Sequence, residues 1–585
     1  MIFVHGVNST GEWYETAEGA ICEGFNQRLG LKDTEFELKY NIYSCDKNAE
    51  KKRHEKRRQL IENNRSPVIR FYWGYRAPQG QEGKYRIPLV NINNEDYHQL
   101  LKAGATPATI AQKGPFFWGG GPFQNGTDQL TSLWSKAGFK SHILGGMLNI
   151  EDMADFDRRL TDAPAREYYA HAATRLAKLL DTVREKYPAD TVSIISHSQG
   201  TMVAMAATLL AKAGPDALFV LNSPFSLELK TVFDHINYPQ AERIPEEGRT
   251  AALSSVVEKV ARRSDHLSGL GTGSLCVGQS WDKKSWTPQV TLRTTAAPAS
   301  VEHPALLPER DNHGRTWIYF CPHDRVMGSN PLLSIGWQGL KNDFHGTPHP
   351  LLQKYAGHLY QRGLARWLPC GAAPRADTPL TSTDGKPFWD DGGDLTTYNN
   401  IGYWTVCING EQVPAPVTVV ELSSLDKSRV GIDEKAGAEL GPGWGQSTKD
   451  PKTGTIAPND DTFDNFYLIY PKIKVAMRYE NSGQEYPKAV AVTRDETDAE
   501  HRARIAQYIS QPTDHSSLPG NEEFMSRVVA FDLPVGFCDS TWDKEFMQYL
   551  RDFADWTHGY DAYFDKGELN YDAMPAVLKY ETQPA

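Results

Sequence analysis

The chain has 585 residues, 40% of them hydrophobic, and a formal net charge of −11. This acidic balance excludes an ordinary nucleic-acid-binding protein, which carries a basic face. No run approaches the roughly 18 consecutive apolar residues that cross a membrane. The seven cysteines are scattered, without a CxxC pair, which predicts reduced thiols in a protein made in the cytoplasm.

Predicted strands and helices alternate along the chain. Short, dense apolar runs predict strands at residues 2–5, 68–73, 191–195, 217–221 and 316–320. Apolar residues at spacings of three and four predict a helix over 176–187, which Pro188 ends, and an apolar helix is predicted over 200–210. This order predicts an α/β fold, with a mostly parallel sheet and helices on both faces.

Three segments interrupt this alternation of strands and helices. Residues 101–160 contain a stretch rich in glycine and aromatic residues, and residues 230–300 are poorly periodic. We expect both to be insertions in a core that spans residues 1–370, where they form a cap or lid. Residues 371–500 form a third predicted insertion, with strand-like runs. Residues 501–585 are predicted to return to the core as a C-terminal extension.

The central motif is Ser196-His197-Ser198-Gln199-Gly200, between an apolar strand and an apolar helix. The G-x-S-x-G nucleophile motif needs this context, because a sharp strand-to-helix turn lifts the serine hydroxyl clear of the backbone. Ser196 replaces the first glycine, a departure that a small side chain tolerates. The motif therefore predicts Ser198 as the nucleophile of an α/β-hydrolase-like protein. The alternative is an ordinary Ser-rich turn.

An oxyanion hole is predicted from two backbone N–H groups, because acyl transfer needs donors aimed at the developing negative charge. One donor is expected at Gln199, the residue after the nucleophile. The second is expected at Gly6 or Val7, where the strand 2–5 ends in His-Gly. A glycine there lets the backbone approach the substrate closely. The alternative is a simple glycine turn at a strand end.

The acid and the base are expected after the serine in chain order. Asp324 follows the strand 316–320, so it is predicted as the acid that orients the imidazole. Its alternative role is a turn-capping aspartate. The base must be a later histidine. His515 is predicted, because it lies in a polar loop before a helix, and His558 is the second candidate. Four further histidines lie between the acid and this loop: His345, His349, His358 and His501.

Aromatic residues flanked by glycines stand out in the first insertion. They are Phe116, Phe117, Trp118 and Phe123. Such a group can form a mobile lid that presents apolar surface to lipid. The alternative is a cluster within the core.

Charged segments give weaker signals. A basic run at 51–58 predicts a solvated helix face or, alternatively, contact with anionic phosphate or lipid head groups. The acidic clusters at 390–394 and 460–461 match no EF-hand pattern and are expected to be solvated loops. We therefore predict no metal and no other cofactor.

Three motifs together resemble the lipase effectors of the bacterial type VI secretion system, most of all their third phospholipase family. The motifs are Ile2-Phe-Val-His-Gly-Val-Asn-Ser9, Ser196-His-Ser-Gln-Gly-Thr201 and Asp514-His-Ser-Ser-Leu-Pro-Gly-Asn521. The resemblance extends over nearly the whole chain. It implies a toxin that hydrolyses the acyl esters of phospholipids with Ser198, Asp324 and His515.

The resemblance also implies where the protein acts and which proteins it binds. It implies delivery into the periplasm of rival bacteria, with the secretion spike protein and a cognate immunity protein as partners. The first residues carry no charged n-region and no long apolar h-region, so no secretory signal is predicted. Two alternatives stay open from the sequence. One is an esterase or thioesterase for a small soluble substrate, and the other is a non-catalytic binding protein on the same fold.

Overall fold

The structure is a computed structural model that describes most of the first 365 residues and the C-terminal part of the chain. The described residues are 1–46, 58–143, 148–149, 160–230, 233–234, 237–264, 290–292, 305–307, 312–324, 326–329, 331–341, 347–365, 370–371, 410–413, 417, 472, 474–481, 489–507 and 514–580. The acidic clusters at 390–394 and 460–461, and His345, lie outside these residues.

A six-stranded sheet forms the centre of the molecule, with the strand order β15-β14-β11-β10-β1-β4. Every neighbouring pair is parallel. The strands are β1 (Ile2–Val4), β4 (Ile69–Phe71), β10 (Ser193–His197), β11 (Ala217–Leu221), β14 (Arg315–Phe320) and β15 (Leu359–Gly363). The four central strands are almost entirely buried, as expected for a parallel sheet that is covered on both faces. The predicted α/β fold is confirmed, and five of its strands were predicted from apolar runs.

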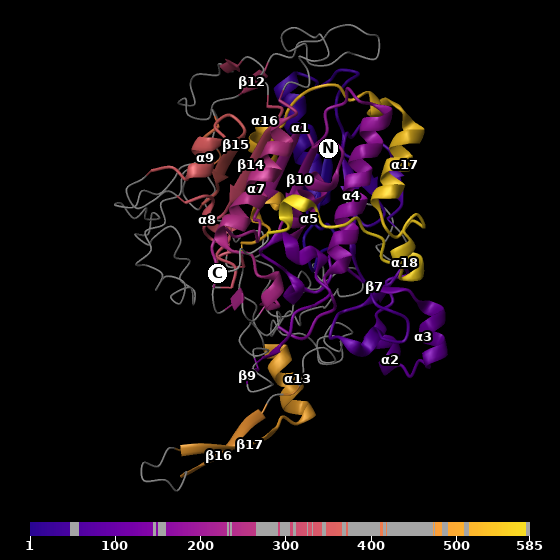
Figure 1. Ribbon diagram of the computed structural model, residues 1–585. Helices are drawn as coiled ribbons and strands as arrows, with labels where there is room; N and C mark the ends of the chain where they lie inside the picture. The colour runs from indigo at the N-terminus through magenta and orange to yellow at the C-terminus, as the bar shows by residue number, and fades with distance from the viewer. Residues whose placement is uncertain are drawn as a thin grey trace, which may run out of the picture.

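Helices cover both faces of this sheet (Figure 1). On one face lie α4 (Glu167–Lys186), α5 (Gln199–Leu210) and α7 (Glu246–Ala261), and α5 contacts both of the others. On the other face lies α1 (Tyr14–Leu29), against the short turns α14 (Ser517–Gly520), α15 (Glu522–Phe524) and α16 (Ala530–Asp532) and the π-turn Met525–Val529 between them.

The helix α7 corrects the sequence prediction for residues 230–300. It lies inside the predicted insertion, yet it is a regular helix of the core, packed against β14 and α5 between the strands β11 and β14. Its buried residues, including Leu253, Val256 and Val260, follow the helical period. Ser, Thr and Glu residues on its exposed side lower the apolar density, which is why the pattern was read as an irregular segment.

Small elements lie beside the sheet between residues 42 and 149, and only the later ones, from residue 107 onward, fall in the first predicted insertion, residues 101–160. The small elements include a three-stranded antiparallel sheet of β5 (Gly74–Arg76), β7 (Phe116–Gly119) and β6 (Val90–Asn91). The others are β2 (Ile42–Tyr43), β3 (Leu60–Glu62), α2 (Tyr97–Lys102), α3 (Pro107–Lys113), β8 (His142–Ile143) and β9 (Leu148–Asn149). The Gly- and aromatic-rich stretch thus contains the central strand β7.

The end of the chain packs on the core in the residues that the structure describes after position 513. Leu518, Phe524 and Val529 are fully buried against α1. The Asp532 carboxylate accepts hydrogen bonds from Arg362 of β15 (2.6 Å from Nη2) and from Tyr319 of β14. The helix α17 (Lys544–Ala554) packs on β4 and α4, and α18 (Ala562–Lys566) follows it.

Few elements are described between residues 371 and 500. The strands β16 (Lys474–Asn481) and β17 (Ala489–Asp495) form an antiparallel pair, and α13 (Asp498–Gln507) follows. This pair and α13 extend away from the body of the molecule (Figure 1). Other described elements include β12 (Val290–Leu292), β13 (Ala305–Leu307), α8 (Ile335–Gln338) and α9 (Pro350–Lys354).

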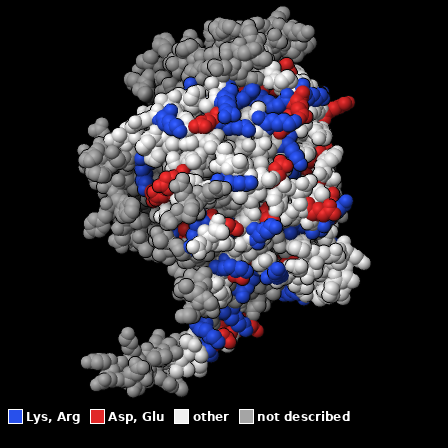
Figure 2. All heavy atoms as spheres, viewed as in Figure 1, with Lys and Arg blue, Asp and Glu red and all other residues white. Residues whose placement is uncertain are grey.

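Lys and Arg side chains are interspersed with Asp and Glu on the face shown in Figure 2. Some of these charges join elements, as Lys186 at the end of α4 does by pairing with Asp543 at the start of α17 (2.7 Å). Such exposed pairs contribute little stability, on the order of 0–1 kcal/mol each. Among the described residues, no helix is both long and apolar enough to cross a membrane.

Candidate active site

Ser198 lies at the sharp turn between β10 and α5, at the carboxyl edge of the parallel sheet. Its backbone has φ 55° and ψ −136°, a left-handed conformation that L-residues rarely adopt. A Cβ on Gly200 would lie 2.3 Å from the His5 carbonyl oxygen, so glycine is required where helix and strand meet. Ser196 replaces the first glycine of the motif without an unsatisfied group, because its hydroxyl donates to the Phe219 carbonyl of β11 (2.7 Å).

His515 contacts both Ser198 and Asp324. Its Nε2 lies 2.7 Å from Ser198 Oγ, and its Nδ1 lies 2.7 Å from Asp324 Oδ2. These partners assign the tautomer: Nδ1–H donates to the carboxylate, and Nε2 accepts from the serine hydroxyl. The structure therefore brings together three residues that were predicted from separate motifs, across 317 positions of the chain.

The Asp324 carboxylate is fully buried in the loop after β14. Besides His515, it accepts hydrogen bonds from Asn222 Nδ2 (2.8 Å) and from the backbone N–H groups of Val326 and Met327 (2.9 Å each). A buried carboxylate needs such donors to offset the loss of water. Asn222, at the end of β11, was not singled out in the sequence, because no local signal marks a side chain that acts through a tertiary contact.

His197, next to the nucleophile, holds the His515 loop in place. Its Nε2 donates to the His515 carbonyl oxygen (2.9 Å), and the two ring centroids lie 4.8 Å apart. Burial first, and then the neighbouring His515, lower the pKa of His197 well below its usual value, so it is neutral near pH 7. No role beyond its place in the nucleophile motif was predicted for His197.

Two of the residues predicted to supply oxyanion donors lie beside the nucleophile. A Cβ added to Gly6 would lie 2.6 Å from Ser198 Cβ and 2.9 Å from its Oγ, so the Gly6 backbone lies directly against the serine. Gly120 packs on the same turn, where an added Cβ would meet the Gly6 carbonyl at 2.1 Å. Gln199 is the first residue of α5, and backbone N–H groups in a first helical turn have no partner within the helix.

His5 fixes the turn that carries Gly6. Its Nδ1 donates to the Gly6 carbonyl oxygen (2.9 Å), and its Nε2 accepts from the backbone N–H of Trp73 (3.4 Å). The Trp73 ring stacks on the imidazole (5.6 Å between centroids) and donates from Nε1 to the His5 carbonyl (2.9 Å). Burial lowers the pKa of His5 to about 3, so the ring is neutral and can make both contacts.

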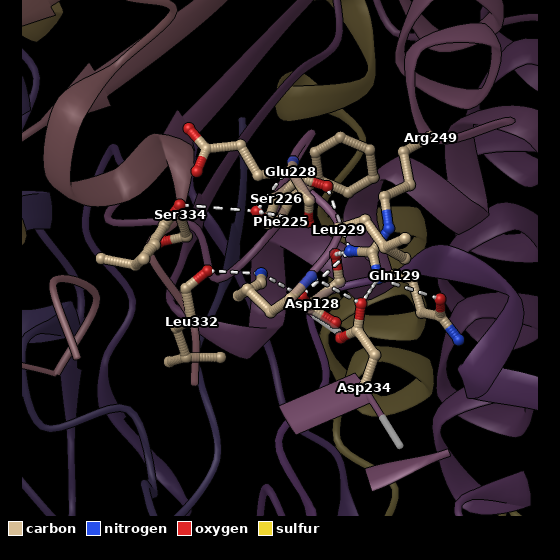
Figure 3. A network of polar contacts seen from close by, with 12 residues as sticks. Asp128, Gln129, Phe225, Ser226, Glu228, Leu229, Asp234, Arg249, Leu332 and Ser334 are labelled. Carbon is tan, nitrogen blue, oxygen red and sulfur yellow. Dashed lines mark hydrogen bonds and ion pairs between the residues drawn. The ribbon is translucent and has the colours of Figure 1, made fainter. Parts of the chain in front are cut away.

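A buried ionic network surrounds Asp128 (Figure 3). The Gln199 side chain accepts from the backbone N–H of Thr127 (3.0 Å), and the adjacent Asp128 pairs with Lys230 and with Arg249 (2.9 Å). Arg249 also pairs with Asp234 (3.1 Å). Burial alone would raise the pKa of Asp128, but the two cations lower it to about 2. The network thus ties the loop beside Gln199 to α7.

The four aromatic residues of the predicted lid lie in or beside β7. Phe116, Phe117 and Trp118 are buried, with at most 8% of each side chain exposed, and Phe123 is half-buried. Phe117 packs on Trp556 and Phe564, with centroids 5.7 and 5.1 Å away. This is the core-cluster placement that was the alternative. The rings reach lipid only if β7 moves, so their lid role stays a prediction.

The second candidate base lies elsewhere. His558 Nδ1 is 3.4 Å from Asp555 Oδ2, at a cavity that contains neither Ser198 nor His515. His349 caps α9, and His358 approaches the Gly314 carbonyl (3.2 Å). In the described part of the chain, no three His, Cys, Asp or Glu side chains gather as a metal site would require.

The parallel sheet, with a serine at a strained turn and a histidine and an aspartate beside it, defines the class of α/β-hydrolase-like proteins. A family model described as the T6SS Tle3 phospholipase effector domain matches residues 1–341. A second, described as the C-terminal domain of the antibacterial effector protein Tle3, matches residues 448–583. The chain therefore belongs to the Tle3 family of type VI secretion system phospholipase effectors, as its motifs predicted.

One curated relative spans nearly the whole chain. The antibacterial effector protein Tle3 of Pseudomonas aeruginosa is 26% identical over 652 aligned residues, which cover 98% of this chain and 86% of that protein. The first family region contains Ser198 and Asp324, and the second contains His515. The site described above is therefore assembled from both regions.

Proposed function

We propose that the chain is an antibacterial phospholipase that hydrolyses the acyl esters of membrane phospholipids through Ser198, His515 and Asp324. Membership of the phospholipase effector family supports the substrate class. The observation that carries the catalytic assignment is the pair of 2.7 Å contacts from the two His515 ring nitrogens to Ser198 Oγ and Asp324 Oδ2. This is the geometry of a nucleophile, a general base and the acid that orients the base.

In the proposed reaction, His515 Nε2 takes the Ser198 hydroxyl proton as Oγ attacks the ester carbonyl carbon. The resulting imidazolium is stabilised by the Asp324 carboxylate. When the tetrahedral intermediate collapses, the imidazolium protonates the departing lysolipid oxygen, which leaves an acyl-serine. Water, deprotonated by the same nitrogen, then attacks the acyl group, and the imidazolium returns that proton to Ser198 Oγ as the fatty acid leaves.

The negative charge on the carbonyl oxygen would be stabilised by backbone N–H groups of Gln199 and of Gly6 or Val7. The close approach of Gly6 to Ser198 and the helix N-terminus at Gln199 support this assignment. His5 and the network around Asp128 act as positioning groups, because they hold the two segments that carry these donors.

The biological setting is part of the same proposal. An antibacterial effector is secreted and acts on target cells, and such toxins are paired with an immunity protein that protects the producer. We place the action of this chain in the target periplasm, with the type VI spike protein as its carrier. Expression in a bacterial host tests the compartment: periplasmic targeting of the wild type should arrest growth, while the same chain retained in the cytoplasm should not.

The catalytic proposal is tested with a serine-directed phosphonate and with lipid-product analysis. The wild type should incorporate one label, on Ser198, and should release fatty acid from phospholipid vesicles. Ser198→Ala should do neither. A label on another residue, or fatty-acid release by Ser198→Ala equal to the wild type, would overturn the assignment. Absence of both labelling and turnover in the folded wild type would favour a non-catalytic binding protein.

The rival enzyme, an esterase for a small soluble substrate, is distinguished by comparing vesicles with a short soluble ester. A phospholipase should prefer the vesicle substrate. Phe123→Ser is the informative lid variant, because Phe123 is half-buried whereas the β7 rings lie in the core. If the lid prediction holds, the variant loses activity on vesicles and keeps it on the soluble ester. Equal loss on both substrates would contradict a lid role.

A further inference from the structure

A cavity of about 400 Å³ lies on the flank of the molecule between β3, the end of β4 and α17. It opens to solvent past the exposed residues Gln59, Ile61 and Gln548. Its deeper walls are built by Tyr43, Arg70, Tyr72, Arg551 and Asp555. None of the residues of the proposed catalytic site lines it.

Two of the three arginines that line this cavity are neutralised by carboxylates. Arg70 pairs with Glu18 and Asp46 (2.7 Å each). Arg58 pairs with Asp555 (3.2 Å), and its guanidinium lies over the Tyr72 ring, 3.9 Å from the centroid.

Arg551 differs from the other two arginines. It is only 9% exposed, and it forms no ion pair with any described residue. Its Nη1 donates to Asn63 Oδ1 over a long 3.3 Å, and its Nε is buried without a hydrogen-bond partner among the described residues. An unpaired buried guanidinium is costly. Because its hydrogen bond to Asn63 is long and its side chain lines the cavity, Arg551 points to an anionic ligand there.

The carboxylates of the lining are already engaged by other side chains. Asp555 is engaged by Arg58, and although burial opposes its ionisation, that cation holds its pKa far below the usual value. The interaction with Asp555 raises the pKa of His558, which lies at the cavity wall 3.4 Å from that carboxylate. Asp552, the other acidic residue of the lining, is turned to the exposed rim, where it accepts from Gln548 (2.8 Å).

We propose that this cavity binds a phosphate group, with Arg551 as the principal ligand. A tetrahedral oxyanion has enough acceptor oxygens to bind donors on several sides of the cavity. These donors are the guanidinium groups of Arg551 and Arg58 and the side-chain amide of Gln59. The phosphate comes either from a phospholipid head group or from free phosphate. Arg58 is the one described residue of the basic run at 51–58, whose contact with anionic phosphate the sequence left open.

This cavity is distinct from the proposed catalytic centre, none of whose residues lines it. The Tyr72 ring contacts the Arg58 guanidinium, and its centroid lies 6.0 Å from that of His5. Binding at the cavity can thus be measured without turnover. Failure of the catalytic proposal would leave the binding result unaffected, and the reverse also holds.

The test measures binding of inorganic phosphate to the full chain by calorimetry. The wild type should bind saturably, and Arg551→Gln should weaken binding by about tenfold or more, as expected for charged hydrogen bonds. Gln548→Glu, which adds a negative charge at the exposed rim, should have a similar effect without disturbing a buried residue. Arg262→Gln, the same substitution at an exposed position on the end of α7, should bind as the wild type does.

A second arm distinguishes the two sources of phosphate. Sedimentation with phosphatidylglycerol vesicles uses the Ser198→Ala background, so that the lipid is not hydrolysed. Loss of vesicle binding in the added Arg551→Gln variant assigns the site to a lipid head group. Unchanged vesicle binding, together with Arg551-dependent phosphate binding, assigns it to free phosphate. Wild-type protein that binds no phosphate, or phosphate binding that survives Arg551→Gln, overturns the proposal.

Discussion

The two ring nitrogens of His515 can serve the proposed reaction in one tautomer only. Asp324 enforces this tautomer, because its Oδ2 accepts from Nδ1–H while its Oδ1 is held by the backbone N–H groups of Val326 and Met327. An amide at position 324 would keep its oxygen at the two N–H groups and present NH₂ to His515. The proton would then move to Nε2, and the base could no longer accept from Ser198.

Asp324→Asn is therefore expected to lower kcat by about 10⁴-fold while the fold is retained. Steady-state fatty-acid release at saturating substrate measures the change. His349→Asn is the matched control, since asparagine keeps the N-cap of α9 and should leave kcat unchanged. A loss of less than about tenfold in Asp324→Asn would show that the aspartate does not set the tautomer.

His5 makes the stability of the fold dependent on pH. Its pKa is about 3 in the folded chain, against an ordinary 6.5, so the unfolded chain binds more protons between these values. The contribution of neutral His5 to stability is complete above pH 6.5 and is lost as the pH falls toward 3. Between pH 7.5 and pH 5, this loss should lower the free energy of unfolding by about 2 kcal/mol.

Urea denaturation at pH 7.5 and pH 5 measures this effect. His5→Asn keeps a donor toward Gly6 but does not titrate, so its stability should fall by about 2 kcal/mol less than that of the wild type over this interval. The pKa of His197 is lowered too, but His197 is present in both proteins, so its effect cancels in the comparison. An identical fall in both proteins would contradict the prediction.

Single residues were predictable where a local motif reports their role. Ser198, Asp324 and His515 each follow a strand or precede a helix in a recognisable pattern. Asn222 and His197 were missed, because their contacts join segments that are distant in sequence, and nothing around them distinguishes an asparagine or histidine of this kind from an ordinary one.

At the scale of elements, the junction of β10 and α5 stores strain at Ser198. A side chain with φ 55° costs of order 1–3 kcal/mol. Glycine would relieve this strain, although it loses more chain entropy on folding. We expect Ser198→Gly to be more stable than Ser198→Ala by about 1 kcal/mol, with both variants inactive.

Chemical denaturation of the two variants checks this difference. Ser193, at the ordinary start of the same strand, supplies the control pair, and there the glycine variant should be less stable than the alanine variant. Equal stability of the two Ser198 variants would mean that the turn is not strained in solution.

Elements with a strong period were predicted correctly, and weakly patterned ones were not. The apolar pattern of the helix α4 and the apolar run of the strand β11 are each visible in the local sequence alone. The strand β7 was read as an irregular flap, because its glycines obscure a strand that is fixed by pairing with β5 and β6. Tertiary contacts decide such segments, and a single sequence does not display them.

At the scale of the whole molecule, the two family regions are interdependent. The C-terminal region supplies His515, and its residues Leu518, Phe524 and Val529 are buried against α1. Burial of each such side chain contributes about 1.5–3 kcal/mol. The C-terminal part after Asp514 is therefore part of the core of the hydrolase-like fold. That residues 501–585 return to the core was predicted only because His515 was assigned as the base.

Co-expression of residues 1–440 with residues 441–585 tests this interdependence. The two pieces should copurify and hydrolyse phospholipid, because the contacts that join them do not require a continuous chain. Residues 1–440 alone should be insoluble and inactive, since the apolar face of α1 loses its cover and the base is missing. A C-terminal piece with His515→Ala should copurify equally well but restore no activity, which separates assembly from catalysis. A soluble, cooperatively folded 1–440 fragment would instead mean that the first region folds on its own, with the C-terminal region docked onto a complete core.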